Sequence, residues 1–207
     1  MTEEVNIKFM RFKKSVGIIL FALLGAFVAT VCDGFHVHTR TLAYPDPFLF
    51  GQAWWVFPGF VLAFLFMAYA YSLIVVRLPA AIPAQKSASR GNARDLVEAV
   101  MAFALVYLLS AFGNFEPALL SVIFYGTFVV RWLFSYDRLW LLLLAVAMAV
   151  GGMFVEGLYA GMGLMTYRYV DVFHVPFWLG GLYVHGAFAL REGMRYFVYD
   201  SKSGALK

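Results

Sequence analysis

Only a few side chains in this sequence have the chemistry and the position to do more than pack. Glu156 and His185 are ionisable groups within long apolar stretches, where an unpaired charge costs on the order of a few kcal/mol. As titrating groups they are compatible with a proton-coupled transporter or a lipid-modifying membrane enzyme. The sequence favours a second interpretation, in which Glu156, near the outer interface, is hydrogen-bonded to a neighbouring helix or wetted by headgroup water, and His185 is hydrogen-bonded in the helical core.

The histidines do not form a pattern typical of a metal site. His36 and His38 are separated by one residue and could chelate an ion, but we expect them in a solvated loop with no further ligand nearby. His174 and His185 would lie about 16 Å apart along a helix, too far to share an ion. The single cysteine, Cys32, excludes an intrachain disulfide and a multi-thiolate site. We therefore predict no metal and no cofactor.

Motifs of established enzyme classes are missing from the chain. It contains no His-Glu-x-x-His zinc motif, no Gly-x-Ser-x-Gly nucleophile turn and no glycine loop for phosphate. The clustered histidines of membrane desaturases are missing as well. We therefore predict that the protein is not an enzyme.

The composition indicates a membrane protein rather than a water-soluble one. Hydrophobic residues make up 63% of the chain and aromatic residues 19%, and the mean hydropathy is +0.78. The net charge of +4 comes from short basic clusters beside apolar stretches, the first of them within residues 8–14. Such clusters are typical of contacts with anionic lipid headgroups, so we predict no nucleic-acid partner.

Six apolar stretches are long enough to cross the hydrocarbon layer, which requires about 20 residues of helix. We predict helices at residues 15–37, 54–76, 96–112, 117–134, 139–162 and 172–190, within a single compact domain that covers residues 1–207. Every Lys and Arg except Arg40 and Arg168 falls on the side that would hold both termini. Because basic loops resist translocation, that side is the cytosol. The predicted fold is therefore an all-α integral membrane protein of six transmembrane helices, with cytosolic N- and C-termini.

The connections between these stretches complete the topology. Residues 77–95 contain Pro79, Pro83 and a run of small, polar and basic residues, and we predict a flexible basic cytosolic loop there. The turns at residues 113–116 and 135–138 are so short that the third, fourth and fifth helices must be antiparallel neighbours. This topology fits a bacterial inner membrane or an endoplasmic reticulum, and we favour the bacterial inner membrane.

Charged and small residues near the fourth and fifth helices carry further expectations. Arg131, near the inner end of the fourth helix, can extend toward Asp137, and Asp137 can cap the fifth helix at its N-terminal dipole. Gly151, Gly152 and the glycines that follow form a stripe of small residues suited to close contact with another helix. Such a stripe also fits an assembly role, for example in a homo-oligomer.

Several stretches, in order, resemble the Insig family of sterol-responsive membrane proteins. Residues 53–58 (Ala-Trp-Trp-Val-Phe-Pro) are similar to the family's Ala-Trp-Trp-Val-Pro-Pro at the head of its second helix. Residues 115–138 align without a gap on its fourth helix, which ends in an Asp-Arg pair. Residues 156–159 (Glu-Gly-Leu-Tyr) are similar to its Asn-Gly-Val-Tyr, and Pro176 with Gly180 and Gly181 matches its last helix.

This resemblance implies a protein that binds a lipid and does no chemistry of its own. Insig proteins bind oxysterol in the bilayer and then a membrane-protein partner such as Scap, for which Asp137 matches the family's aspartate. Phe57 replaces a proline of the family, and Leu120 stands where the family has a sterol-contacting glutamine. The loss of that amide indicates a more apolar ligand. We therefore favour a diacylglycerol-like lipid as the ligand, with a sterol-like lipid as the alternative.

The lipid site is predicted from helical position together with the family match. Leu120, Phe124 and Phe128 recur at every fourth residue and form one stripe of the fourth helix. Trp55 and Tyr159 could close the wall with their amphipathic rings. The alternative is that this stripe is ordinary helix packing. The sequence thus favours a lipid-binding or lipid-sensing protein that holds a neutral lipid among its helices, with transport or lipid modification through Glu156 and His185 as the alternative, and a purely structural role as a third.

Overall fold

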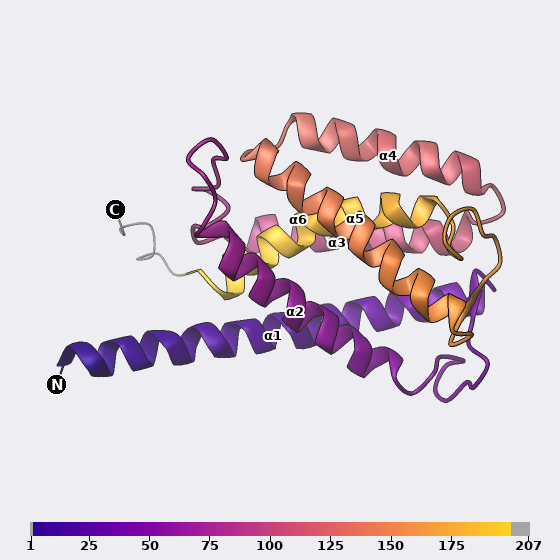
Figure 1. Cartoon of the computed structure of the whole chain (residues 1–207), viewed down its shortest axis with the longest axis horizontal. Coiled ribbons are helices and arrows are strands. Elements are labelled where there is room, and N and C mark those ends of the chain that lie inside the picture. Colours follow the sequence, from indigo (N-terminus) through magenta and orange to yellow (C-terminus); the bar gives the residue numbers. More distant parts are fainter. Residues whose placement is uncertain (1, 200–207) are drawn as a thin grey trace.

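Long runs of Leu, Val, Ala and Phe without interruption by proline or charge make this chain mostly helical. The computed structural model describes the backbone of residues 2–199 and the side chains of residues 14–199. Within that range it contains α1 (Thr2–His38), α2 (Val56–Val75), α3 (Ala93–Phe112), α4 (Pro117–Leu133), α5 (Arg138–Gly161) and α6 (Trp178–Phe197) (Figure 1). The predicted all-α membrane fold is confirmed. Side chains of residues 8–13 and 202–207, expected at the lipid headgroups, lie outside the described ones.

The helices differ in how well they suit a lipid environment. Helix α1 from Lys14 onward, α2, α3 and α5 are long and apolar enough to cross a membrane, and α4 is apolar but shorter. The N-terminal end of α1 and the C-terminal end of α6 lie at the same end of the molecule (Figure 1). The distribution of Lys and Arg indicates that this is the inner, cytosolic end. The opposite end is called the outer end below.

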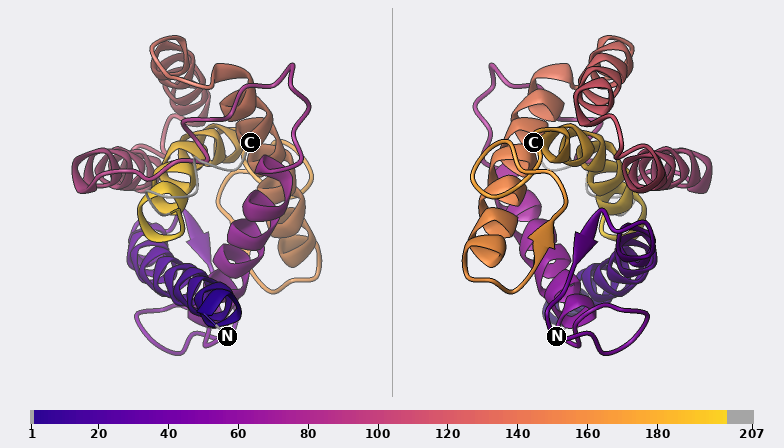
Figure 2. Two further views of the ribbon diagram at one scale, coloured as in Figure 1. Left: turned by 90° about the vertical axis from the view of Figure 1, so that its left-hand side faces the viewer. Right: turned by 90° about the vertical axis from the view of Figure 1, so that its right-hand side faces the viewer.

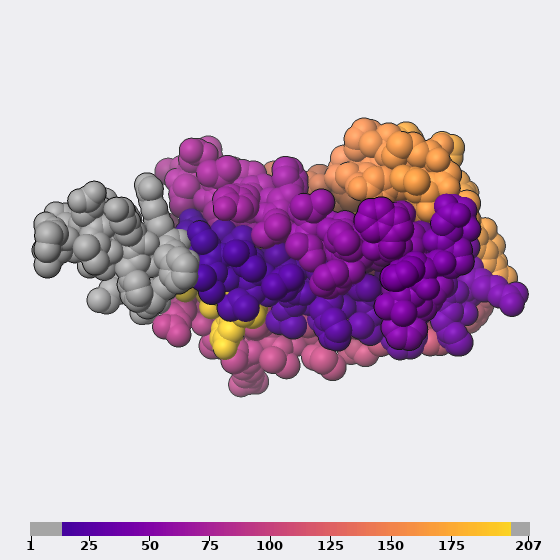
Figure 3. Space-filling view, turned by 90° about the horizontal axis from the view of Figure 1, so that it is seen from below, coloured from indigo at the N-terminus to yellow at the C-terminus, as the bar shows by residue number. Residues whose placement is uncertain are grey.

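Helix α6 forms the centre of the bundle. It packs against α3, α4 and α5 and also touches α1 and α2, and Figure 2 shows it surrounded by the other helices. Glycines allow this close packing: a Cβ added to Gly193 would lie 2.2 Å from the ring of Phe21 on α1. Helices α1 and α2 run side by side over one face of the molecule (Figure 3).

The inner end of α6 carries a buried charged cluster. Glu192 forms ion pairs with Arg191, at 2.9 Å, and with Arg195. The hydroxyl of Tyr136 donates a hydrogen bond to Glu192, and the guanidinium of Arg191 lies 3.9 Å from the centre of the Tyr136 ring. Because these charges are paired within the protein, α6 can be central without being apolar along its whole length.

A small sheet joins the outer connections. Strand β1 (Leu42–Ala43) pairs with β2 (Thr166–Tyr167) in antiparallel register, with Leu42 opposite Tyr167. This pairing links the α1–α2 connection to the α5–α6 connection. Strands of two residues carry no alternation of polar and apolar side chains, so no sequence pattern predicted them.

Two expectations near helix ends were wrong. Helix α1 ends at His38, one residue beyond the predicted end, and His36 is not in a solvated loop but is 1% exposed within this helix. Its Nε2 is hydrogen-bonded at 2.8 Å to the hydroxyl of Ser110 on α3, which satisfies a polar group that would otherwise oppose burial. Helix α6 begins at Trp178 rather than at residue 172, because Phe173 and His174 have positive φ angles and cannot continue a helix.

The connection between α2 and α3 is hydrogen-bonded to neighbouring elements, and its predicted flexibility stays a prediction. The backbone N–H of Ser87 donates to Asp137 at 2.7 Å. The hydroxyl of Tyr71 donates to the Ser87 carbonyl at 3.0 Å. Helix α3 then begins at Ala93, where Asn92 accepts a hydrogen bond from the N–H of Asp95 at 2.8 Å and caps the helix.

Candidate functional site

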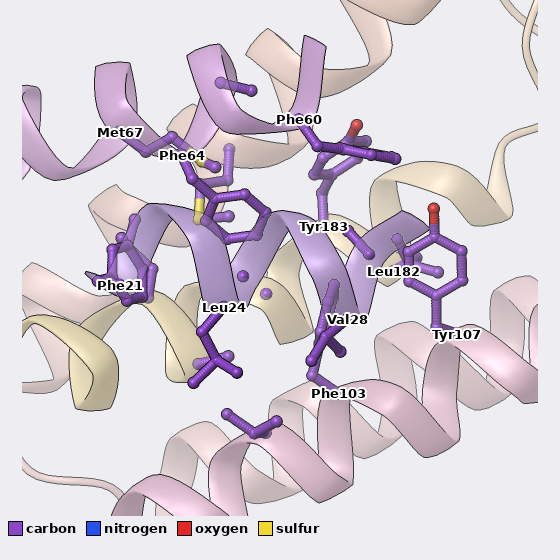
Figure 4. A pocket seen from close by; sticks show the side chains of 18 of the residues that line it. Phe21, Leu24, Val28, Phe60, Phe64, Met67, Phe103, Tyr107, Leu182 and Tyr183 are labelled. Carbon is purple, nitrogen blue, oxygen red and sulfur yellow. The ribbon is translucent and has the colours of Figure 1, made fainter. Parts of the chain in front are cut away.

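An apolar cavity of about 120 Å³ lies among α1, α2, α3, α5 and α6 (Figure 4). Apolar cavities of this order of size stay dry and accept apolar guests. Most of its wall is made of large hydrophobic side chains, among them Phe21, Leu24, Val28, Phe60, Phe64, Met67, Phe103 and Leu182. The cavity is therefore a candidate binding site for the apolar part of a ligand.

Local packing of α1 against α2 shapes one side of this cavity. The rings of Phe21 and Phe64 meet edge to face, with their centres 5.7 Å apart. Gly25 lies beneath Phe64, where an added Cβ would be 2.6 Å from the ring. A glycine on α1 thus lets an aromatic side chain of α2 reach into the bundle.

Two tyrosines provide the polar groups of the cavity. Tyr107 on α3 and Tyr183 on α6 are the lining residues that carry a hydroxyl. The Tyr183 hydroxyl donates a hydrogen bond to Glu156. Tyr107 is only 7% exposed, and its hydroxyl has no hydrogen-bond partner within the described part of the chain. An unpaired hydroxyl that borders a cavity is suited to bind the polar head of a ligand.

Buried carboxyl groups lie behind these tyrosines, at the outer end of the bundle. Glu156 on α5 accepts hydrogen bonds from Tyr167 and Tyr183. Asp33 on α1 is 3% exposed and accepts hydrogen bonds from the Tyr44 hydroxyl and the Gln52 side-chain amide, both at 2.9 Å. The expectation that Glu156 is hydrogen-bonded to a neighbouring helix is met, since Tyr183 belongs to α6. Asp33 was not singled out in the sequence as a functional candidate.

His185 is fixed by groups on α4. Its Nδ1 lies 2.9 Å from Nη1 of Arg131, and its Nε2 lies 2.9 Å from the carbonyl oxygen of Phe124. Because a guanidinium only donates and a carbonyl only accepts, Nε2 carries the proton and Nδ1 accepts from Arg131. The imidazole is therefore a neutral core group, as the sequence favoured. Glu156 and His185 share no hydrogen-bond partner among the described residues.

Arg131 and Asp137 do not behave as expected. Arg131 points to His185 and lies 4.1 Å above the ring of Phe188, so it does not extend toward Asp137. Asp137 stands at the N-cap position of α5, but its side chain makes no capping hydrogen bond to that helix. Its carboxylate instead accepts from Ser87. The backbone of Asp137 is in the left-handed region, with a φ of 46°, while its carboxylate bonds to Ser87.

The five residues predicted to bind lipid lie outside the lining of the cavity. Leu120, Phe124 and Phe128 are buried on α4, and Phe124 packs against Gly181 of α6. Trp55 and Tyr159 contact each other edge to face, with ring centres 5.4 Å apart. Leu120, Phe124, Trp55 and Tyr159 belong to one hydrophobic core cluster, and Phe128 belongs to another. Their lipid-binding role stays a prediction, and the cavity is a further candidate that no sequence signal identified.

Within the described side chains, no group of three or more His, Cys, Asp or Glu residues is arranged to hold an ion. His36 is engaged with Ser110, and His185 with Arg131. The arrangement is suited to binding an amphiphile, with an apolar wall and hydroxyl groups at one end.

Comparison with known proteins identifies the fold. The structure is similar to the crystal structure of MvINS, an Insig homologue from Mycobacterium vanbaalenii, with a TM-score of 0.68 and 22% sequence identity over 92% of this chain and 97% of that chain. The chain has the Insig fold. A crystal structure of a cross-linked MvINS trimer matches the Insig fold of this chain with a TM-score of 0.66 and 22% identity, over 87% of this chain and 94% of that one. No protein-family model and no curated protein sequence matches the chain.

Proposed function

We propose that this protein binds a neutral lipid, diacylglycerol-like or sterol-like, within its transmembrane bundle and has no catalytic activity of its own. The observation that carries the proposal is the apolar cavity with the unpaired Tyr107 hydroxyl on its wall. The Insig fold adds support, because the sequence resemblance to that family independently implied a lipid ligand. The cavity would hold part of an acyl chain or ring system, and Tyr107 would meet the polar head.

Transport or lipid modification through Glu156 and His185 is less well supported. His185 is held neutral between Arg131 and Phe124, so it offers no free nitrogen for proton transfer. Glu156 accepts hydrogen bonds from two tyrosines and is not linked to His185. The substitution Glu156→Gln separates the two functions, since an amide would abolish proton-coupled turnover but leave a lipid-binding protein intact.

The proposal extends to assembly and location. A homo-oligomer is supported by the trimeric arrangement in which MvINS was cross-linked. Anionic headgroups would contact the inner basic clusters, and a bacterial inner membrane is the proposed location. A membrane-protein partner would dock near Asp137, at the inner end of α5.

Native mass spectrometry of the protein in mild detergent tests the lipid proposal. We expect a stoichiometric neutral lipid, identified after extraction. Val28→Trp places an indole in the cavity and should remove the adduct, whereas Val122→Trp, at a position that is 71% exposed on α4, should retain it. Tyr107→Phe keeps the shape of the wall and should weaken retention. A protein free of lipid in all preparations would refute the proposal.

A further inference from the structure

Two buried acids lie close to the tyrosines that line the cavity, and one of them, Glu156, accepts a hydrogen bond from Tyr183. The carboxyl groups of Asp33 and Glu156 both interact electrostatically with the hydroxyl of Tyr107 and with that of Tyr183. The two acids also interact with each other. Figure 4 shows both tyrosine side chains among the residues that line the cavity. A ligand head at this position therefore experiences the field of two acids.

Within the described side chains, no base is paired with these acids. The four hydrogen bonds that described residues make to them come from uncharged donors, the hydroxyls of Tyr44, Tyr167 and Tyr183 and the amide of Gln52. Within residues 14–199, no Lys, Arg or His side chain forms an ion pair with either acid. The nearby His36 is hydrogen-bonded to Ser110 instead.

Side-chain chemistry then determines which heads are compatible. A carboxylate accepts hydrogen bonds and donates none, so it attracts a hydroxyl or an ammonium group and repels another anion. Repulsion between like charges is stronger in a site shielded from water than at the surface. The unpaired hydroxyl of Tyr107 can accept from the ligand head or donate to it, so it does not itself discriminate between them.

We propose that Asp33 and Glu156 determine head-group specificity, so that the cavity admits lipids with a hydroxyl or ammonium head and excludes those with a carboxylate or phosphate. This inference rests on the proposed function, in which the cavity holds a lipid. The two acids that would select among lipid head groups do not themselves line the apolar wall of the cavity. Repulsion between these carboxylates and an anionic head group would exclude anionic lipids from the cavity.

Three probes with the same tail test the inference: octadecanol, octadecylamine and octadecanoate. Binding is measured in mixed detergent micelles at pH 8.5, by displacement of a fluorescent lipid. At that pH a carboxyl group is ionised and an amine is largely protonated. We expect the alcohol and the amine to bind and octadecanoate to bind at least about tenfold more weakly, which corresponds to about 1.4 kcal/mol.

The isosteric variants Glu156→Gln and Asp33→Asn assign the effect to the acids. Each should strengthen octadecanoate binding and so narrow the roughly tenfold difference from octadecanol. Glu116→Gln and Asp46→Asn are matched controls, because both acids are exposed and neither lines the cavity. These controls should preserve the preference of the unmodified protein.

The outcomes separate the inference from the proposed function. Failure of all three probes to bind would overturn lipid binding itself and the inference with it. Equal binding of the three probes would overturn the inference alone, and so would a preference that survives in both acid variants. If an acid variant fails to fold, the comparison of the three probes on the unmodified protein still tests whether the cavity excludes anionic heads.

Discussion

The carboxylate of Asp137 accepts a hydrogen bond from the backbone N–H of Ser87, at 2.7 Å, although 50 residues separate them in sequence. The carbonyl of Ser87 accepts another from Tyr71 on α2. The α2–α3 connection is thereby fastened between α2 and the start of α5. Asp137 thus acts on the connection rather than as a cap of its own helix.

Asp137→Ala should loosen this connection. The Ser87 N–H would lose its partner at a residue that is fully buried, which costs about 1–3 kcal/mol of unfolding free energy. We expect a lower melting temperature in detergent and faster tryptic cleavage at Arg77, Lys86 or Arg90. The exposed Asp46→Ala is the matched control and should change neither. Loss of bound lipid with unchanged stability would contradict this role.

The helical architecture could be predicted from the sequence because it depends on properties of single segments. Apolar length defined the helices, and the distribution of Lys and Arg placed both termini on one side. The burial of Asp33 and His36 within α1 was missed, since the hydrogen-bond partner of each side chain lies outside that helix. Hydropathy carries no information on such partners.

The candidate site was beyond sequence reasoning for a similar reason. Leu24 and Val28 have the character of lipid-facing residues, and only the packing of α1 against α2 and α3 turns them toward a cavity. The α4 stripe has a clear period, but Phe124 lies against Gly181 and fills the space between α4 and α6. A periodic pattern identifies a buried face without showing whether a ligand or a helix covers it.

The α4 stripe can be distinguished from the cavity by truncation. Phe124→Ala removes a fully buried ring and should lower the unfolding free energy by about 3 kcal/mol or more. Val122→Ala, on the exposed side of α4, should change it by no more than about 0.5 kcal/mol. If the cavity is the lipid site, folded Phe124→Ala should retain its lipid in native mass spectrometry. Selective loss of lipid would instead support the predicted site on α4.

Arg131 and His185 should be energetically coupled. Arg131→Met leaves Nδ1 of His185 without its donor, and we expect a loss of about 1–3 kcal/mol in unfolding free energy. A double-mutant cycle with His185→Leu should show a coupling of more than about 0.5 kcal/mol, because the two side chains are in direct contact. Arg94→Met, an exposed arginine on α3, is the control. Additive effects of the two substitutions would show that the contact contributes little.

Adjacent glycines on α5 provide a matched test of the link between Tyr183 and Glu156. A Cβ added to Gly152 would lie 2.4 Å from the ring of Tyr183, whereas nothing lies within 4 Å of one added to Gly151. Gly152→Ala must therefore displace the Tyr183 ring, and with it the hydroxyl that bonds to Glu156.

We expect Gly151→Ala to be neutral or to stabilise the helix by up to about 1 kcal/mol, because alanine favours helix over glycine. Gly152→Ala should lower the melting temperature and weaken octadecanol binding, since Tyr183 lines the cavity. Both variants carry the same chemical change on the same helix, so the difference between them reports the contact with Tyr183. If the two variants melt and bind alike, the position of Tyr183 is not essential to the polar end of the cavity.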